Sequence, residues 1–194
     1  MKAGFAGEEA PMVYPTIFGV PKYGKPLDGC HERENFCCDT AFQYRAVVDL
    51  TYPIVRGEIE EWEQMEKILQ YTFFNCLRVD PSEGNPILII DNSLTGGSNH
   101  EKLTTLMFET FNAKKLLIRD ASSMPLFASG RTTGLVVNCG DEITLTTAFF
   151  EGYRVPESSK KIARGGRDIT RFMTKLLKAI DMPLTTSSEF ELVR

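Results

Sequence analysis

Residues 128–153 read ASGRTTGLVVNCGDEITLTTAFFEGY, and this stretch decides the fold. The apolar run at 135–137 and the segment 143–150, which is rich in threonine and aromatic residues, both suit β-strands. Between them, Gly140 and Asp141 are residue types of a tight turn. The sequence therefore predicts a β-hairpin, and the main-chain amides of such a turn can bind phosphate.

Strands alternate with helices along the rest of the chain. β-Branched and apolar runs predict strands, and apolar residues at three- and four-residue steps predict amphipathic helices. This alternation predicts a mixed α/β fold. The expected strands lie within residues 2–17, 44–51, 86–90 and 116–118, the expected helices within 58–77, 122–129, 167–178 and 185–194, a further helix begins at an Asn99 cap, and 19–34 has loop composition.

Length, charge and hydropathy narrow the class of protein. A chain of 194 residues is long enough to bury a core in one or two domains. The net charge of -4 gives no field that favours nucleic acid or a membrane. No apolar run approaches the roughly 20 residues that cross a bilayer, and the first residues lack the apolar centre of a secretion signal. We therefore expect the chain in the cytoplasm, or in the nucleus by passage from it.

Five cysteines are scattered along the chain, and an odd count does not suit a secreted disulfide framework. Cys30, His31, Cys37 and Cys38 lie close in sequence and could supply four zinc ligands. Their spacing matches none of the usual ligand pairs. Reduced, exposed thiols are therefore the expectation, and a zinc-binding module is the alternative.

Six short motifs, taken in this order and at these spacings, resemble actin and the actin-related proteins. The resemblance covers the whole chain without a gap, begins one strand late and stops near the middle of a full family member. It implies the first half of an actin-like, two-lobed ATPase fold of the hexokinase and sugar-kinase type, with mixed β-sheets flanked by helices. The motifs are FAGEEAP at 5–11, TYPIVRG at 51–57, MEKIL at 65–69, MFETFN at 107–112, ASGRTTG at 128–134 and FEGYRVP at 150–156.

The resemblance also divides the chain into subdomains. In the family, the loop that corresponds to 24–34 contacts a neighbouring subunit through an apolar centre. Here that loop is charged, which makes burial costly, so we do not expect ordinary filament contacts; a flexible exposed loop is the alternative. Residues 1–16 and 54–128 correspond to actin subdomain 1, 17–53 to subdomain 2, 129–164 to the start of subdomain 3 and 165–194 to the start of subdomain 4.

A site for ATP or ADP with Mg²⁺ is implied by the resemblance, clamped between two hairpins. The second family hairpin corresponds to the predicted hairpin within residues 128–153, in whose turn Gly140 and Asp141 match the family. Asn138 stands where a metal-side carboxylate occurs, and its neutral amide would hold the cation weakly, through water. Glu142 replaces a glycine that lets the main chain approach phosphate, and its charge repels the ligand. We therefore expect nucleotide binding to be degraded.

The other nucleotide contacts of the family are only partly represented. Its first hairpin has no counterpart here, and Lys2 resembles the lysine that reaches the phosphates, with a solvated basic terminus as an equal alternative. Gly166, Arg167 and Asp168 match a family Gly-Arg-Asp near the ribose. The alternative is that they only start a helix, where the helix dipole favours an acidic residue.

Hydrolysis in the family requires a water molecule aligned with the terminal phosphate. By resemblance, Ala121 replaces a glutamine that orients this water, and Leu145 replaces a histidine near it. Neither side chain can direct a water molecule. We expect little or no ATP hydrolysis and assign no catalytic residue.

The family's docking cleft for partners corresponds to Phe127, Gly130, Thr132 and Tyr153. The expected partners are therefore actin, actin-related proteins and actin-binding proteins. The leading hypothesis is a divergent actin-like protein of the cytoskeleton or of an actin-related assembly, with degraded nucleotide chemistry. The alternatives are an incomplete chain of an ATP-binding, filament-forming actin, and a truncated product without a function of its own.

Overall fold

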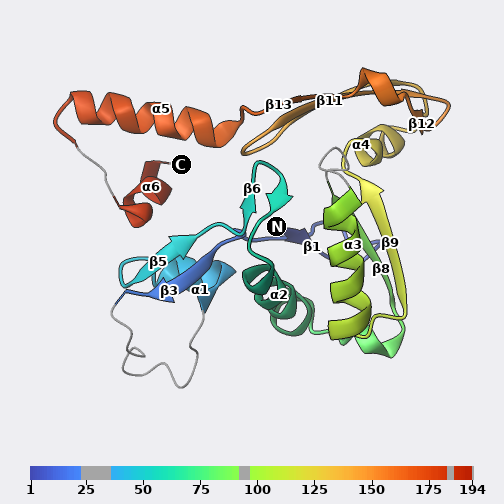
Figure 1. The fold of residues 1–194 in the computed structure, drawn as a ribbon, viewed down its shortest axis with the longest axis horizontal. Coiled ribbons are helices and arrows are strands. Elements are labelled where there is room, and N and C mark those ends of the chain that lie inside the picture. The colour runs from blue at the N-terminus through green and yellow to red at the C-terminus, as the bar shows by residue number, and fades with distance from the viewer. Residues whose placement is uncertain (23–35, 92–96, 183–185, 194) are drawn as a thin grey trace. The chain divides into compact units, whose positions relative to one another are not determined.

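A computed structural model describes residues 1–22, 36–91, 97–182 and 186–193. Several small β-sheets are flanked by helices, which confirms the prediction of a mixed α/β fold (Figure 1). None of the described helices is both long enough and apolar enough to cross a membrane.

Two compact units divide the chain. The first unit gathers the N-terminal sheets with the segment that ends the chain, and the second contains the hairpin. The first unit comprises Met1–Val55, Ile59–Asp80 and Thr174–Arg194, and the second comprises Arg56–Glu58 and Pro81–Met173.

The strands described in the N-terminal part of the first unit form two antiparallel sheets. β1 (Lys2–Ala3) pairs with β2 (Met12–Val13), as the sequence predicts. In the other sheet, β3 (Phe18–Pro21) lies between β4 (Phe36–Cys37) and β5 (Val48–Thr51). β3 occupies the start of the segment expected to be a loop, so the expectation was wrong for residues 19–21.

Helices complete the first unit. α2 (Trp62–Gln70) continues into the π-helical turn η1 (Tyr71–Leu77), and α6 (Ser187–Val193) contacts β5. α1 (Cys38–Gln43) was not expected from the sequence. Among the described residues, buried side chains gather in two clusters: Tyr14, Phe18, Cys37, Cys38 and Ile68 in one, and Ile17, Phe36, Ala41, Val48 and Leu50 in the other.

In the second unit, two parallel strands precede the hairpin. β8 (Pro86–Asp91) and β9 (Lys115–Asp120) pair in parallel along their whole length. α4 (Ser123–Ala128) packs against β9 and the first hairpin strand. The remaining elements here are η2 (Pro81–Glu83), α3 (Gly97–Thr105) and the π-helical turn η4 (Leu106–Thr110).

The predicted hairpin is confirmed. β10 (Gly134–Cys139) pairs with β11 (Thr144–Phe150) from Gly134 opposite Phe149 to Cys139 opposite Thr144. Alternate β11 residues, Leu145, Thr147 and Phe149 among them, are buried. β12 (Tyr153–Arg154), η5 (Pro156–Ser158), β13 (Lys160–Ile162) and α5 (Gly166–Ala179) follow in sequence (Figure 1).

Three further boundaries differ from the sequence prediction. The helix expected over 58–77 begins only at Trp62, because β6 (Ile54–Val55) and β7 (Glu58–Ile59) form a small hairpin through Arg56 and Gly57, whose φ angles are 52° and 80°. Tyr44 ends α1 rather than starting β5. Asn99 is the third residue of α3, so it does not cap that helix.

Candidate functional site

The turn of the β10–β11 hairpin closes on itself. The N–H of Gly140 donates a hydrogen bond to the carbonyl oxygen of Ile143 at 2.9 Å. On the adjoining strands, Asn138 lies opposite Leu145. The amide of Gly140 is therefore already used within the turn.

The start of α5 is fastened to this turn by main-chain hydrogen bonds. The N–H of Gly166 donates to the carbonyl of Gly140 at 3.0 Å, and the N–H of Arg167 donates to that of Asp141 at 2.7 Å. Gly165 approaches so closely that a Cβ there would stand 2.5 Å from the carbonyl oxygen of Asp141. The predicted hairpin turn and the segment at the start of α5 therefore lie together.

The side chain of Arg167 binds both carboxylates of the turn. Its Nε and Nη2 lie 3.1 and 2.9 Å from Oδ2 of Asp141, and its Nη1 lies 3.0 Å from Oε1 of Glu142. The side chains of Arg167 and Glu142 are only 11% and 12% exposed. These distances are normal for charge-assisted hydrogen bonds. The guanidinium of Arg167 therefore supplies a positive charge beside the two carboxylates of the turn.

Arg56 approaches Glu142 from the β6–β7 turn. Its main-chain N–H donates to Oε2 of Glu142, and its Nη1 donates to the carbonyl oxygens of Glu142, at 3.4 Å, and of Ala163. Arg56 was not expected from the sequence to be a site residue. The Arg56-Gly57 pair signals a turn, but no local pattern announces a contact 86 residues away.

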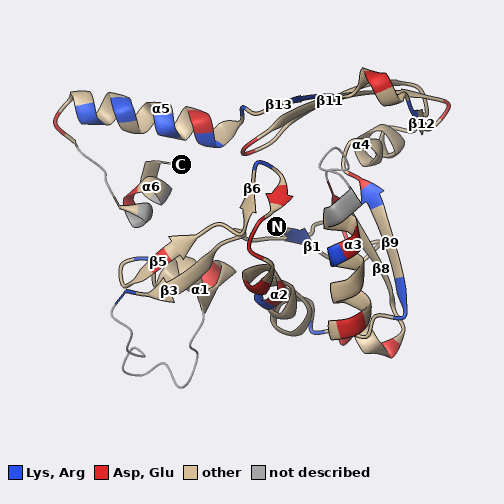
Figure 2. Ribbon diagram, viewed as in Figure 1, with Lys and Arg blue, Asp and Glu red and all other residues tan. Residues whose placement is uncertain are grey.

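Asp168 stabilises the beginning of α5. Its Oδ2 accepts a hydrogen bond from the N–H of Gly165 at 3.1 Å, and its carboxylate lies 3.6 Å from Arg56 and 3.5 Å from Arg171. The hydrogen bond from Gly165 is the main cause that holds the pKa of Asp168 below its usual value, with nearby arginines adding to it against the effect of burial. Figure 2 shows this acidic first turn followed by basic residues along α5. An acidic residue in the first turn is the arrangement that a helix dipole favours. The role of Gly166, Arg167 and Asp168 near a ribose stays a prediction.

The remaining predicted residues are not part of the turn itself. Lys2 is an exposed residue of β1, in the first unit. Ala121 follows β9 and donates its N–H to the carbonyl of Asp91 at 2.8 Å. Leu145 is 1% exposed and belongs to the core of the second unit.

The turn does not fit the phosphates of a nucleotide. A phosphate would approach the carboxylates of Asp141 and Glu142, and like charges at short range repel. The amide of Gly140, which could otherwise donate to a phosphate oxygen, is committed to Ile143. We therefore derive no chemical step through ATP or Mg²⁺ at this turn.

Cys37 and Cys38 are core residues, which makes the expectation of exposed thiols wrong for this pair. They are 8% and 0% exposed, and burial raises their pKa values to about 11 and about 12. Cys30 and His31 lie outside the described residues. Among the residues that are described, no group of three or more His, Cys, Asp or Glu side chains could hold a metal ion.

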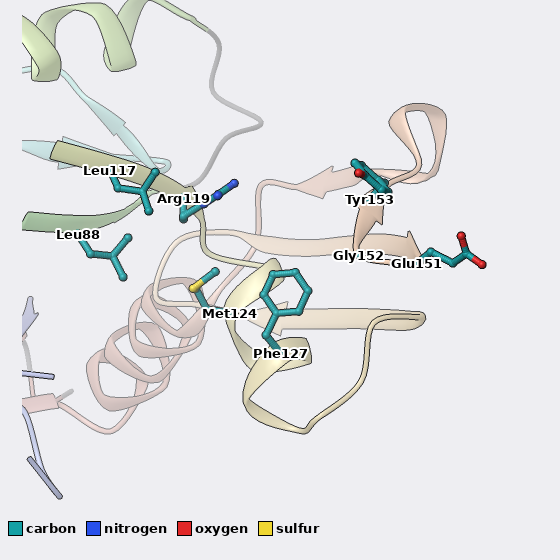
Figure 3. A pocket seen from close by; sticks show the side chains of 8 residues that line it. All are labelled: Leu88, Leu117, Arg119, Met124, Phe127, Glu151, Gly152 and Tyr153. Atoms are coloured by element: carbon teal, nitrogen blue, oxygen red, sulfur yellow. The ribbon is translucent and has the colours of Figure 1, made fainter. Parts of the chain in front are cut away.

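A groove of about 500 Å³ contains half of the predicted partner cleft. Phe127 and Tyr153 line it, whereas Gly130 and Thr132 act through the main chain: Gly130 donates to Phe127 at 2.9 Å, and Gly152 donates to Thr132 at 2.7 Å. Figure 3 shows leucines on one side, the tyrosine on the other, and a methionine and phenylalanine between them. The lining residues are Leu88, Leu117, Arg119, Met124, Phe127, Glu151, Gly152 and Tyr153.

The leucines of this groove were not anticipated. Leu88 and Leu117 are 52% and 49% exposed, although residues 86–90 read as a buried strand. Alternating exposure along β8 and β9 leaves one face of the pair open. Continuous apolar runs of this kind belong to strands covered on both faces, so the sequence carries no signal for the open face.

A comparison with known families agrees with these observations. The sequence model described as Actin matches residues 1–192, nearly the whole chain. The mixed sheets with flanking helices are those of the first half of an actin-like fold. The chain belongs to the actin family.

Proposed function

We propose that this protein is a divergent actin-like component of the cytoskeleton or of an actin-related assembly, with degraded nucleotide binding and no ATP hydrolysis. The observation that carries the proposal is the position of Glu142. Its carboxylate sits in the hairpin turn, 3.0 Å from the guanidinium of Arg167. A negative charge fixed at that point opposes the phosphates of ATP or ADP.

Two more substitutions support the loss of hydrolysis. Ala121 has no polar group beyond its main chain, and Leu145 is buried in the hydrophobic core. Positioning a water molecule needs a hydrogen-bonding side chain at the reaction site. Asn138, with a neutral amide in place of a carboxylate, attracts Mg²⁺ only weakly.

The substitutions at Ala121, Leu145 and Asn138 affect nucleotide chemistry and do not prevent binding to other proteins. The groove beside Phe127 and Tyr153 is apolar along its leucine side and offers a docking surface to actin, an actin-related protein or an actin-binding protein. Such a role belongs to the cytoplasm and its cytoskeleton, with the nucleus as a second compartment. The proposed subdomain division follows the family: 1–16 and 54–128, 17–53, 129–164 and 165–194.

Two assays test the proposal together. Magnesium-dependent ATP hydrolysis by the purified protein is compared with that of conventional actin at equal concentration, and association with purified actin is measured by cosedimentation and by pull-down. We expect no hydrolysis above background together with saturable association. Hydrolysis at the rate of conventional actin would refute the loss of nucleotide chemistry, and absence of any association would refute the assembly role.

A second candidate is an ATP-binding, filament-forming actin to which further sequence belongs. Exposed apolar residues favour it: Leu88 and Ile90 of β8 and Ile169 and Phe172 of α5 are 52%, 54%, 72% and 61% exposed. Surfaces of this kind are normally covered by other protein. The intact mass of the native protein from its cells separates the two: 21.8 kDa favours the first candidate, and about twice that favours the second.

A further inference from the structure

Glu142 is held from two sides within the second unit. One carboxylate oxygen lies 3.0 Å from Nη1 of Arg167, and the other accepts the main-chain N–H of Arg56. The side chain is only 12% exposed, so these bonds are little screened by solvent. A guanidinium and a main-chain amide converging on one anion are the donors that a bound phosphate or sulfate would receive.

We infer that Glu142 is an internal anion that fills the place an anionic ligand would need between Arg167 and the main chain of Arg56. This inference rests on the proposed function, because it names the residue that excludes phosphate from the turn. It goes further in one respect: Glu142 does not merely repel a ligand but replaces it as the partner of the two donors. The turn is therefore stabilised without a nucleotide.

The guanidinium of Arg167 is divided between two carboxylates. Asp141 takes Nε and Nη2, and Glu142 takes Nη1. A phosphate reaching Arg167 would have to displace a carboxylate that has already lost most of its water. It would also face the charge of the other carboxylate at close range.

Two carbonyls of the turn connect it to α5 independently of the carboxylates. The carbonyls of Gly140 and Asp141 accept the first amides of α5, from Gly166 and Arg167. These hydrogen bonds do not involve the side chain of Glu142. A substitution at Glu142 therefore changes the anion while leaving these main-chain hydrogen bonds between the turn and α5 in place.

Three variants distinguish the effect of the carboxylate charge, the effect of the space that the side chain fills, and the effect of removing any surface acid. Glu142→Gly removes the carboxylate and opens its place, while Glu142→Gln removes only the charge. Glu157→Gln, in the exposed η5 turn of the same unit, is the matched control. The probe is inorganic tripolyphosphate, measured by titration calorimetry and by the shift of thermal unfolding; MgATP is titrated in parallel.

The wild type and the control should show no saturable tripolyphosphate binding. Glu142→Gly should bind at least about tenfold more tightly, and tripolyphosphate should raise its unfolding temperature. A partly unfolded variant remains informative, because an anion that takes the vacated place shifts unfolding upward. Glu142→Gln should raise the unfolded-to-folded ratio about tenfold, since it weakens a charge-assisted contact with little solvent.

Either of two binding results would overturn the inference: tight tripolyphosphate binding by the wild type, or no gain in tripolyphosphate affinity in Glu142→Gly. Unchanged stability of Glu142→Gln would equally deny that the carboxylate holds the turn. Failure of the proposed function looks different. Tight MgATP binding by the wild type, with tripolyphosphate still excluded until Glu142 is removed, would refute degraded nucleotide binding and leave the inference standing.

Discussion

Gly165 lies against Asp141 so closely that a single added carbon would stand 2.5 Å from the carbonyl oxygen of Asp141. The same carbon would lie 2.7 Å from the amide nitrogen of Glu142. Both atoms belong to the main chain and cannot move aside as the end of a side chain can. The close approach of α5 to the hairpin turn therefore depends on glycine at this position.

Gly165→Ala should accordingly separate the turn from α5. We expect a loss of about 1–3 kcal/mol in the free energy of unfolding, the usual cost of forcing extra atoms into a packed region. The matched control is Gly166→Ala, because a Cβ there would meet Asp141 at an ordinary 3.8 Å. Chemical denaturation of both variants checks the prediction, and equal stability of the two would contradict it.

Tyr14 and Thr72 form a buried hydrogen bond in the first unit. The phenol donates to Oγ1 of Thr72 at 2.7 Å, and that hydroxyl donates to the carbonyl of Ile68 at 2.7 Å. Tyr14→Phe should cost about 1 kcal/mol in unfolding free energy. A double-mutant cycle with Thr72→Val should show that the two losses are not additive; full additivity would mean that the pair does not interact.

Burial raises the pKa of Tyr14 to about 12. The unfolded chain ionises first, near 10, so it binds fewer protons than the folded chain above that pH. The stability associated with Tyr14 is therefore complete below pH 10 and is lost as the pH rises toward 12. Denaturation midpoints across this range should fall more steeply for the wild type than for Tyr14→Phe, and parallel curves would contradict the assignment.

Asp168 should stabilise the second unit only while it is ionised. The hydrogen bond from Gly165 and the arginines nearby hold its pKa below 3.8, so its contribution is present above that pH and disappears as the pH falls through the folded value. Asp168→Asn should therefore be less stable than the wild type at pH 7 and approach it in acid. Denaturation of both at pH 7 and near pH 3 measures this, with Glu157→Gln as the surface control; a difference that persists unchanged in acid would refute it.

Cysteine reactivity should follow burial. At pH 7.5 very little of Cys37 or Cys38 is thiolate, because burial raises their pKa values to about 11 and about 12, while Cys139 is exposed. Alkylation of the native protein should be at least about 100 times slower at the buried pair than at Cys139. Peptide mapping of iodoacetamide-treated protein gives the ratio, with denatured protein as the control. Rapid native labelling of Cys38 would show that this core is open.

The hairpin could be predicted from sequence because its signals are local. Apolar and threonine-rich runs flank Gly140 and Asp141, and these residues form the expected turn between paired strands. The helix α5 was equally accessible, since its apolar residues recur at helical spacing. Both the hairpin and α5 could be predicted because the residues that determine them are close together in the sequence, where the spacing of apolar residues indicates secondary structure.

Contacts between distant segments could not be predicted in the same way. The sequence predicts that Glu142 opposes phosphate, but it does not predict the contact with Arg56, which is 86 residues away and belongs to a turn with no periodic pattern. The helix α1 was missed for a related reason: it opens at Cys38 with a φ of 53°, which propensity does not anticipate. Burial of Cys37 and Cys38 likewise follows from tertiary packing rather than from residue type.

We propose that the Glu142 turn has lost its affinity for nucleotide, and equilibrium binding of MgATP to the native protein tests this most directly. Titration with a fluorescent ATP analogue, beside conventional actin as the positive control, measures the dissociation constant. We predict no saturable binding at concentrations up to about 1 mM, which corresponds to a binding free energy weaker than about -4 kcal/mol. Saturable binding of MgATP with an affinity comparable to that of conventional actin would contradict the account.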